Sequence, residues 1–341
     1  MSQDGGRVTI SDVAVRAGVS RALVSIVLRG VAGASDESRR RVRQAAEELD
    51  YRPDQRARLL RSARSRQVGV VFGLHADFHA DLVDHLYRAA EGTGYELALG
   101  AATPARDERR AVQSLLDYRC EALLLLGPAL ARRSIEELAE RVPVVVLARA
   151  LRSRAVDVVR TDDVAGARLA VEHLATLGHR EIAHVDGQRA PGAAERRRGY
   201  RAAMREAGLA AYETLVPGGP TEEDGEAAAA RLLADRAPAA PTAVTAFNDH
   251  CAAGLMAAAR DSGLGVPGDL SVVGFDDSRI AGLSIVALTT IAQDAPALAR
   301  SALRLALRRV EDPAVGPTEV VVAPRLVNRR TTAPPRGLPP G

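Results

Sequence analysis

The sequence predicts a small all-α helix-turn-helix domain followed by an α/β domain of two doubly wound parallel-sheet lobes. Short helical patterns separated by a glycine fill the first fifty residues, which is typical of a helix-turn-helix unit. From residue 68 onward, apolar strand patterns alternate with helical patterns, which is typical of parallel sheets. This alternation restarts near residue 160, so we expect two lobes with a cleft between them.

Length and composition exclude several classes of protein. The chain has 341 residues, of which 47% are hydrophobic and 26% charged, as in an ordinary globular protein of two or three domains. Its longest apolar runs, residues 122–126 and 142–148, are far shorter than the roughly 18–20 residues that cross a bilayer. Residues 1–9 lack the apolar centre of a signal peptide, so we expect a cytoplasmic protein. The two cysteines, Cys120 and Cys251, provide neither a disulfide framework nor a multi-cysteine zinc site.

Positive charge is concentrated at the start of the chain. Residues 1–66 contain 14 arginines and 8 acidic residues, whereas the remaining 275 residues contain 32 arginines and 35 acidic residues. All 46 basic residues are arginine, which we attribute to genomic base composition and not to chemistry. A basic first segment on a slightly acidic body favours an anionic partner, of which nucleic acid is the commonest.

Three short helices are expected near the N-terminus. Thr9 and Asp12 fit a capping box that opens the first helix, and Gly18 supplies the turn that ends it. Ser20 is suited to cap the second helix, and the third follows Ser35. The apolar residues that recur at helical spacing are expected to form one core: Ile10, Val13, Ala14, Ala17, Val24, Val27, Leu28, Val42, Ala45, Ala46 and Leu49.

The second of these helices is the candidate for reading DNA. Its outward face, which would enter a major groove, is expected to carry Arg21, Ala22, Ser25, Ile26 and Arg29. The alternative is a generic three-helix packing module whose arginines only solvate the surface. Periodicity alone favours DNA binding over that alternative.

The N-terminal motifs resemble those of the LacI/GalR family of bacterial transcription repressors. Members typically read T-I-x-D-V-A-x-x-A-G-V-S and then G-Y-R-P-N-x-x-A-R-x-L. The first motif is matched by Thr9, Ile10, Asp12, Val13, Ala14, Ala17, Gly18, Val19 and Ser20. The second is matched by Tyr51, Arg52, Pro53, Ala57, Arg58 and Leu60, with Asp50 and Asp54 replacing the usual Gly and Asn.

The resemblance implies how the protein would contact DNA. The residues expected to contact DNA are Thr9, Ser20, Arg21, Ala22, Ser25, Ile26, Arg29, Tyr51, Arg58 and Leu60. Base contacts fall on Arg21, Ala22 and Ile26, of which Arg21 is best suited to a bidentate guanine contact. Ile26 departs from the polar or basic residue that is frequent there, and it suits only a thymine methyl. In the family the hinge folds into a helix on operator DNA, and a leucine at the position of Leu60 wedges open the central base step. The alternative for Leu60 is that it begins the core of the next domain.

The body of the chain resembles the family's effector domain, which has the type I periplasmic-binding-protein-like fold. The matching pieces include 161–187, 195–209, 247–258, 266–277 and 288–294. Strands are expected at 68–73, 95–99, 121–126, 143–148, 181–185, 242–246 and 270–275, with helices at 79–92, 107–118, 163–177, 192–207 and 249–262. The expected domains are a helix-turn-helix domain (1–50), a hinge and linker (51–66), a two-lobed effector-binding and dimerisation domain (67–332) and a disordered tail (333–341).

Ligands of such folds bind between the lobes, at the carboxyl ends of the strands. The effector contacts that the resemblance carries to this region are Phe78, Arg149, Arg196, Asn248, Asp249, Asp276 and Gln293. Arginine forks and carboxylates suit a polyhydroxylated ligand, because each grips two adjacent hydroxyls. The alternative for each residue is an interlobe salt bridge or a strand-end cap.

One departure bears on the ligand. The family often carries D-x-x-N-P-F-F after its first strand, whereas residues 74–82 read LHADFHADL and keep only Phe78 as an aromatic wall. A sugar is the expected effector, with a nucleoside, another small polar metabolite or loss of effector response as alternatives. The expected partners are pseudo-palindromic operator DNA, this effector and a second copy of the chain, as a homodimer or a tetramer.

The motifs give little support for an enzyme. His75 and His79 are four residues apart, but neither a carboxylate nor a third histidine accompanies them at metal spacing. The first predicted strand is followed by GLHADF and not by the G-x-G-x-x-G of a dinucleotide-binding site, and the sequence contains no P-loop and no nucleophile elbow. We therefore expect neither a cofactor nor catalysis. The function that the resemblance implies is that of a homodimeric, effector-responsive transcription repressor. The alternatives are a ligand-binding module, an α/β enzyme with a DNA-binding appendage, and an activator or global regulator.

Overall fold

The computed structural model describes residues 8–28, 32–51, 64–74, 77–234 and 240–336. The chain divides into two compact units, Met1–Ser65 and Arg66–Gly341, which are described separately below. The predicted contacts at Arg29, Arg58 and Leu60 lie outside the described residues, as does His75.

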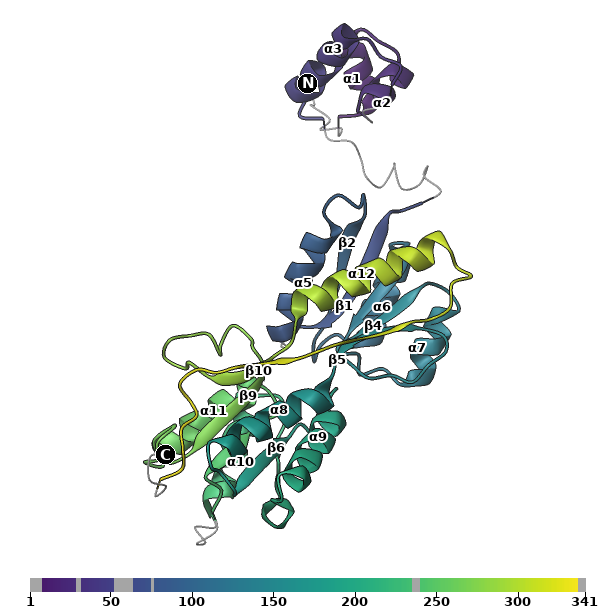
Figure 1. Cartoon of the computed structure of the whole chain (residues 1–341). Helices are drawn as coiled ribbons and strands as arrows, with labels where there is room; N and C mark the ends of the chain where they lie inside the picture. The colour runs from purple at the N-terminus through teal and green to yellow at the C-terminus, as the bar shows by residue number, and fades with distance from the viewer. Residues whose placement is uncertain (1–7, 29–31, 52–63, 75–76, 235–239, 337–341) are drawn as a thin grey trace. The chain divides into compact units, whose positions relative to one another are not determined.

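The first unit is a three-helix domain, shown in purple in Figure 1. Its helices are α1 (Ile10–Ala17), α2 (Arg21–Leu28) and α3 (Asp36–Glu48). Gly18 ends α1 in the left-handed region at φ 63°, a conformation that glycine adopts without strain. The predicted core is confirmed, with buried side chains from all three helices: Val13, Ala14, Ala17, Val24, Val27, Val42, Ala45 and Ala46.

Polar contacts also hold the three helices together. One guanidinium nitrogen of Arg41 on α3 donates to the Ala17 carbonyl at the end of α1, at 2.5 Å. Arg16 donates from Nε to Glu48 at 2.7 Å, which joins the ends of α1 and α3. The Arg41 bond satisfies a carbonyl group at the C-terminus of α1, where backbone carbonyls have no partner within the helix.

The second unit contains two six-stranded sheets within the described residues, which confirms the two-lobed α/β fold (Figure 1). The first lobe's sheet has the order β11-β5-β4-β3-β1-β2 and is parallel throughout. Its strands are β1 (Gln67–Gly73), β2 (Glu96–Ala102), β3 (Ala122–Leu126), β4 (Val144–Leu147), β5 (Asp157–Thr161) and β11 (Glu319–Val322).

The second lobe's sheet has the order β12-β10-β9-β8-β6-β7. It is parallel except at its edge, where β12 pairs antiparallel with β10. Its strands are β6 (Ile182–Asp186), β7 (Thr214–Pro217), β8 (Ala243–Thr245), β9 (Ser271–Asp276), β10 (Thr289–Ala292) and β12 (Arg325–Val327).

Helices cover both faces of each sheet, which makes the lobes doubly wound. In the first lobe, alternate residues of β3 face α5 (Asp77–Ala90) and α12 (Ala295–Glu311) on one side, and α6 (Glu108–Asp117) and α7 (Arg132–Ala139) on the other. In the second lobe, α8 (Asp163–Thr176) and α9 (Ala193–Glu206) cover one face, and α10 (Glu222–Ala234) and α11 (Asp249–Asp261) the other. A short 3-10 turn, Ala210–Tyr212, follows α9.

The chain passes between the lobes after β5, after β10 and after β11. The predicted restart near residue 160 is the first of these passages. The second returns the chain to the first lobe, where Leu298, Ala302 and Leu305 of α12 complete the core beside β1 and β3. Three connections between two rigid lobes form a natural hinge.

The sequence patterns did not predict five of the strands. These are β5, β7, β10, β11 and β12, each three to five residues long. They are short, and β5, β11 and β12 contain charged residues, so their apolar pattern is too brief to recognise without the neighbouring strand. Their existence depends on pairing across the sheet.

The end of the chain requires a correction, because residues 333–336 were expected in a disordered tail. Instead, Ala333 accepts hydrogen bonds through its carbonyl from His179 Nε2 at 2.8 Å and Ser271 Oγ at 3.0 Å. Arg336 forms an ion pair with Asp269. These polar groups of the second lobe satisfy the backbone and hold the segment against β9, which proline-rich composition alone does not predict.

Candidate functional site

The predicted DNA-reading face of α2 points outward within the first unit. Arg21 and Ala22 are exposed, whereas Val24 and Val27 on the opposite face are buried. Ser25 and Ile26 are half-buried. The helix therefore presents its N-terminal residues most fully, and these are the residues that helix-turn-helix units place against base edges.

Thr9 and Ser20 act as helix caps. The Asp12 carboxylate accepts hydrogen bonds from both the backbone N–H and the hydroxyl of Thr9, each at 2.8 Å. These bonds lower the pKa of Asp12 below its usual range. Ser20 Oγ accepts from the Leu23 backbone N–H at 3.2 Å and caps α2, as predicted. Thr9 thus holds the N-terminus of α1, and Ser20 holds the N-terminus of α2, which follows the turn.

Tyr51 is the last described residue before the predicted hinge. It is half-buried and packs against the core of the first unit, and its backbone N–H donates to the Ala46 carbonyl at 2.8 Å. The aromatic ring therefore anchors the chain to α3 at the point where the hinge motif begins.

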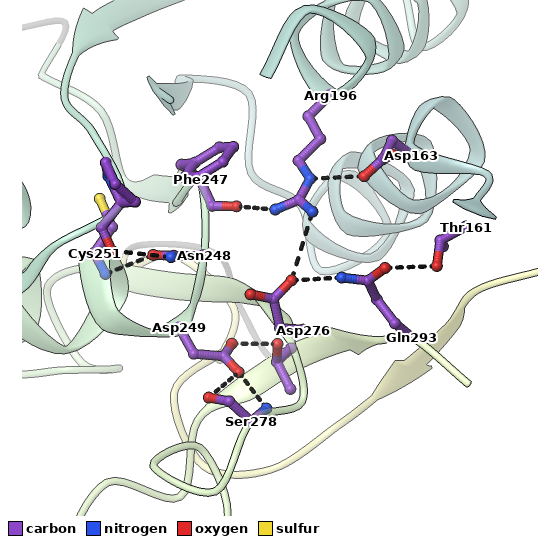
Figure 2. A network of polar contacts seen from close by, with 12 residues as sticks. Thr161, Asp163, Arg196, Phe247, Asn248, Asp249, Cys251, Asp276, Ser278 and Gln293 are labelled. Carbon is purple, nitrogen blue, oxygen red and sulfur yellow. Dashed lines mark hydrogen bonds and ion pairs between the residues drawn. The ribbon is translucent and has the colours of Figure 1, made fainter. Parts of the chain in front are cut away.

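In the second unit, Arg196 is the centre of a buried polar network (Figure 2). The side chain of Arg196, on α9, is 7% exposed. Its Nε donates to Asp163 at 2.8 Å and one terminal nitrogen donates to the Phe247 carbonyl at 2.6 Å. The other terminal nitrogen lies 3.5 Å from Asp276. The guanidinium also stacks on the Phe275 ring, 3.6 Å from its centroid.

Asp276 joins this network to the passages between the lobes. Its Oδ1 accepts from Gln293 Nε2 at 2.8 Å, and Gln293 Oε1 in turn accepts from the Thr161 hydroxyl at 2.6 Å (Figure 2). Thr161 ends β5 and Gln293 follows β10, so the chain of bonds spans the first and second connections. The structure thus brings together three predicted residues, Arg196, Asp276 and Gln293.

Asp276 is also strained and poorly solvated. Its φ of 112° lies in a region that residues other than glycine rarely adopt, at a cost on the order of 1–3 kcal/mol. Burial raises the pKa of Asp276 above its usual range, and the positive charge of Arg196 opposes that rise. Strained, desolvated carboxyl groups of this kind concentrate at binding sites.

Two predicted neighbours support the loops around the network. The Asp249 carboxylate is fully buried and accepts from the backbone N–H and the hydroxyl of Ser278, at 2.7 and 2.8 Å. It also accepts from the Thr290 hydroxyl at 2.5 Å. Asn248 caps α11 through a bond from the Cys251 N–H at 2.8 Å and donates to the Pro220 carbonyl at 2.9 Å. Asn248 is thus the N-cap of α11.

Arg149 lies in the first lobe and braces a loop. One of its terminal nitrogens donates to the carbonyl groups of Pro128 and Leu130 at 2.6 and 2.7 Å. The half-buried Arg149 therefore orders the segment that follows β3. Neither of these contacts joins Arg149 to the Arg196 network.

Phe78 lies on the buried face of α5, contrary to expectation. It was expected as an aromatic wall of the cleft, but its side chain is only 8% exposed and belongs to the core of the first lobe. Phe78 shares a helical face with Leu82 and Leu86, at spacings of four residues, and this face packs against the sheet.

Sequence reasoning missed two members of the network, Thr161 and Asp163. Asp162 caps α8 by accepting from the Ala165 N–H at 3.0 Å, whereas Asp163 turns inward to Arg196. The signal was present as two consecutive acidic residues before a helical pattern, since only one of them is needed as a cap.

His250 is a further contact between the lobes that the motifs did not reveal. Its Nδ1 lies 2.5 Å from Glu222 of α10, and its Nε2 lies 2.9 Å from Asp77 of α5 in the first lobe. Burial lowers the pKa of His250, but the hydrogen bond and charge of Glu222 and the charge of Asp77 outweigh it, so the pKa is raised.

Among the residues that the structure describes, no group of three or more His, Cys, Asp or Glu side chains is placed to hold a metal ion. His79 instead accepts a hydrogen bond from the Gly73 N–H at 3.1 Å, and burial lowers its pKa to about 4. No helix in the described ranges is long and apolar enough to span a membrane.

Comparison with known proteins adds independent findings. Residues 9–54 match the family model of bacterial regulatory proteins of the lacI family, and residues 171–332 match a periplasmic binding protein-like domain. The HTH-type transcriptional regulator GalR of Escherichia coli strain K12 is 35% identical over 332 residues, which are 96% of each chain.

Solved structures share the same architecture. A LacI transcriptional regulator from a Rhodococcus species is 48% identical, with a TM-score of 0.76 over 79% of this chain and 98% of that chain. The lac repressor dimer bound to operator and the anti-inducer ONPF is 28% identical, with a TM-score of 0.82 over 96% of this chain and all of that chain.

Proposed function

Since the chain belongs to the lacI family of bacterial regulatory proteins, it is a DNA-binding transcriptional regulator, and we propose that it is a repressor controlled by a small polar effector held between its lobes. The observation that carries this proposal is the Arg196–Asp276–Gln293 network, which lies at the connections between the lobes. A ligand that engages these groups acts where the angle between the lobes is set.

The first unit would supply the DNA contacts. We propose that two copies read the half-sites of a pseudo-palindromic operator as a homodimer, with α2 in the major groove. Arg21 would contact guanine and Ile26 a thymine methyl, while Ala22 and Ser25 lie on the same face. The motif residues Arg58 and Leu60 belong to the hinge, with Leu60 as the wedge at the central base step.

We propose a sugar or a related metabolite as the effector. The site pairs a guanidinium with carboxylate and amide groups, which suits vicinal hydroxyls. Relatives support this chemistry, because a LacI family regulator from Enterococcus faecium was solved with bound ribose and the regulator CelR with cellobiose. The buried aromatic rings of Phe247 and Phe275 stack on Arg196 itself, so the polar groups would carry recognition.

Effector and operator binding would be coupled through the connections between the lobes. A ligand that binds one interlobe angle more tightly shifts the population toward that angle. The same free energy then changes operator affinity, and the operator changes effector affinity by the same factor. This role needs no catalytic step, and operator binding implies a cytoplasmic location.

The proposal is tested by selecting fragments of the source genome with the purified full-length protein at about physiological salt. Recovery of one pseudo-palindromic sequence with a flexible central pyrimidine–purine step is expected. Genes beside the sites would then nominate sugars for a second round, in which the cognate sugar changes operator affinity. Binding that stays indifferent to sequence, both alone and in the presence of ribose or cellobiose, would overturn the repressor assignment.

A further inference from the structure

A cavity in the two-lobed unit is lined by none of the residues that form the Arg196 network. It has a volume of about 490 Å³, within the range of roughly 300–1,000 Å³ that small-molecule sites occupy. The segment between β4 and β5, the paired strands β5 and β11, and the N-terminal part of α9 surround it. The first three belong to the first lobe and α9 to the second, so the cavity is bounded by both lobes.

The cavity is strongly basic. Arg152 and Arg154 enter from the first lobe and Arg198 from α9. All three are exposed and form no ion pair with any residue that the structure describes. A fourth arginine, Arg160, is neutralised, because its Nε lies 2.7 Å from Glu319.

One carboxylate faces these arginines. Glu195 lines the cavity from the first turn of α9 and, among the described residues, makes no ion pair. Three guanidinium groups therefore meet a single uncompensated carboxylate. Like charges held around one concave space repel one another and raise the local concentration of anions.

We propose that this cavity is a second ligand site, which binds a phosphate-bearing anion. A terminal phosphate carries a charge of about −1.5 to −2 and three acceptor oxygens, which match the paired donors of several guanidinium groups. Arginine suits this chemistry because its planar fork binds phosphate in a bidentate manner.

Occupation of the site joins the two lobes. Arg152 and Arg154 hold the anion from the first lobe while Arg198 holds it from the second, so the bound anion favours the interlobe angle at which the arginines converge. The site thereby adds an input to the regulator that is separate from the effector site and does not depend on the identity of that effector.

The test is calorimetric titration of the full-length protein with inorganic pyrophosphate at constant ionic strength. The cavity variant is R152Q/R154Q/R198Q. Its control is R132Q/R133Q/R205Q, which removes the same charge from exposed arginines outside the cavity and keeps the arginine-rich first unit intact. We expect saturable binding that weakens at least about tenfold in the cavity variant, since this variant loses the charge-assisted hydrogen bonds of all three guanidinium groups.

A variant that is expected to bind pyrophosphate more tightly provides a second test. E195Q removes the carboxylate that faces the arginines, so it is expected to tighten pyrophosphate binding. Equal weakening in the cavity and control variants, or an E195Q variant that binds more weakly, would overturn the proposal, as would binding that never saturates. Selection of genomic DNA by the wild-type protein is unaffected by these outcomes, so the two proposals fail separately.

Discussion

Arg196 on α9 and Asp163 on α8 form an ion pair of 2.8 Å, with side chains only 7% and 5% exposed. The pair joins two closely packed helices. Their close approach requires glycine at position 199 of α9, since a Cβ there would lie 2.3 Å from the carbonyl oxygen of Val164 on α8. Burial raises the pKa of Asp163, while the charge of Arg196 and the hydrogen bond from it lower the pKa. The arginine is therefore both a structural tie and the centre of the proposed effector site.

Arg196→Ala is expected to destabilise the second unit by about 3–5 kcal/mol, because it leaves the buried carboxylates of Asp163 and Asp276 without their cation. Urea unfolding at neutral pH measures this loss. The control is Arg205→Ala on the exposed face of the same helix, which should change stability by no more than about 0.5 kcal/mol. Similar losses in both variants would show that the network contributes nothing specific.

Arg21→Ala is expected to relax base preference at one position in each operator half-site, at a cost of about 1–3 kcal/mol. The measurement is competition among operators that differ at single base pairs, once the selected sequence is known. Arg40→Ala, an exposed position on α3, serves as the control and should leave base preference unchanged. An unaltered preference in the Arg21 variant would remove that residue from the reading set.

Leu60→Ala is expected to weaken specific binding while most of the salt-dependent, non-specific binding remains. An apolar wedge gains its free energy from the kinked operator, whereas non-specific affinity comes from phosphate contacts. Titrations with operator and with random duplex at several salt concentrations separate the two terms. A parallel loss of both would contradict the wedge assignment.

His250, which contacts both lobes, should make the free energy of unfolding depend on pH. Its folded pKa is raised above the ordinary value of 6.5 by Glu222 and Asp77, despite the opposing effect of burial. A raised folded pKa means that the protonated histidine stabilises the fold fully at low pH, and this contribution is lost as the pH rises through the folded value. Urea unfolding from mildly acidic to alkaline pH should therefore show falling stability above about pH 6.5.

The matched variant for that experiment is His250→Gln, which keeps a hydrogen-bonding side chain but does not titrate. The free energy of unfolding of this variant should not show the decline with rising pH that His250 causes in the wild type. Superimposable pH dependences for the wild type and the variant would show that the contacts to Glu222 and Asp77 do not hold the lobes together.

Local sequence patterns were sufficient for much of the fold. In the first unit, helical spacing identified the core, and Gly18 and Ser20 marked the turn and the second cap, because these features involve residues only a few positions apart. The strands β1, β3 and β9 were also recognisable, since strands buried on both faces are continuous apolar runs. Arg196, Asp276 and Gln293 could be named from motifs before their contacts were known.

Contacts between distant residues were decided only by the tertiary structure. The bond from Thr161 to Gln293 joins positions 132 residues apart, and the contact of His250 with Asp77 crosses from one lobe to the other. Edge strands such as β11 form because β5 offers its backbone groups, and Phe78 enters the core because α5 turns that face inward. Sequence determines which side chains a helix or strand presents, but only packing determines what each side chain meets, because that depends on elements far away along the chain.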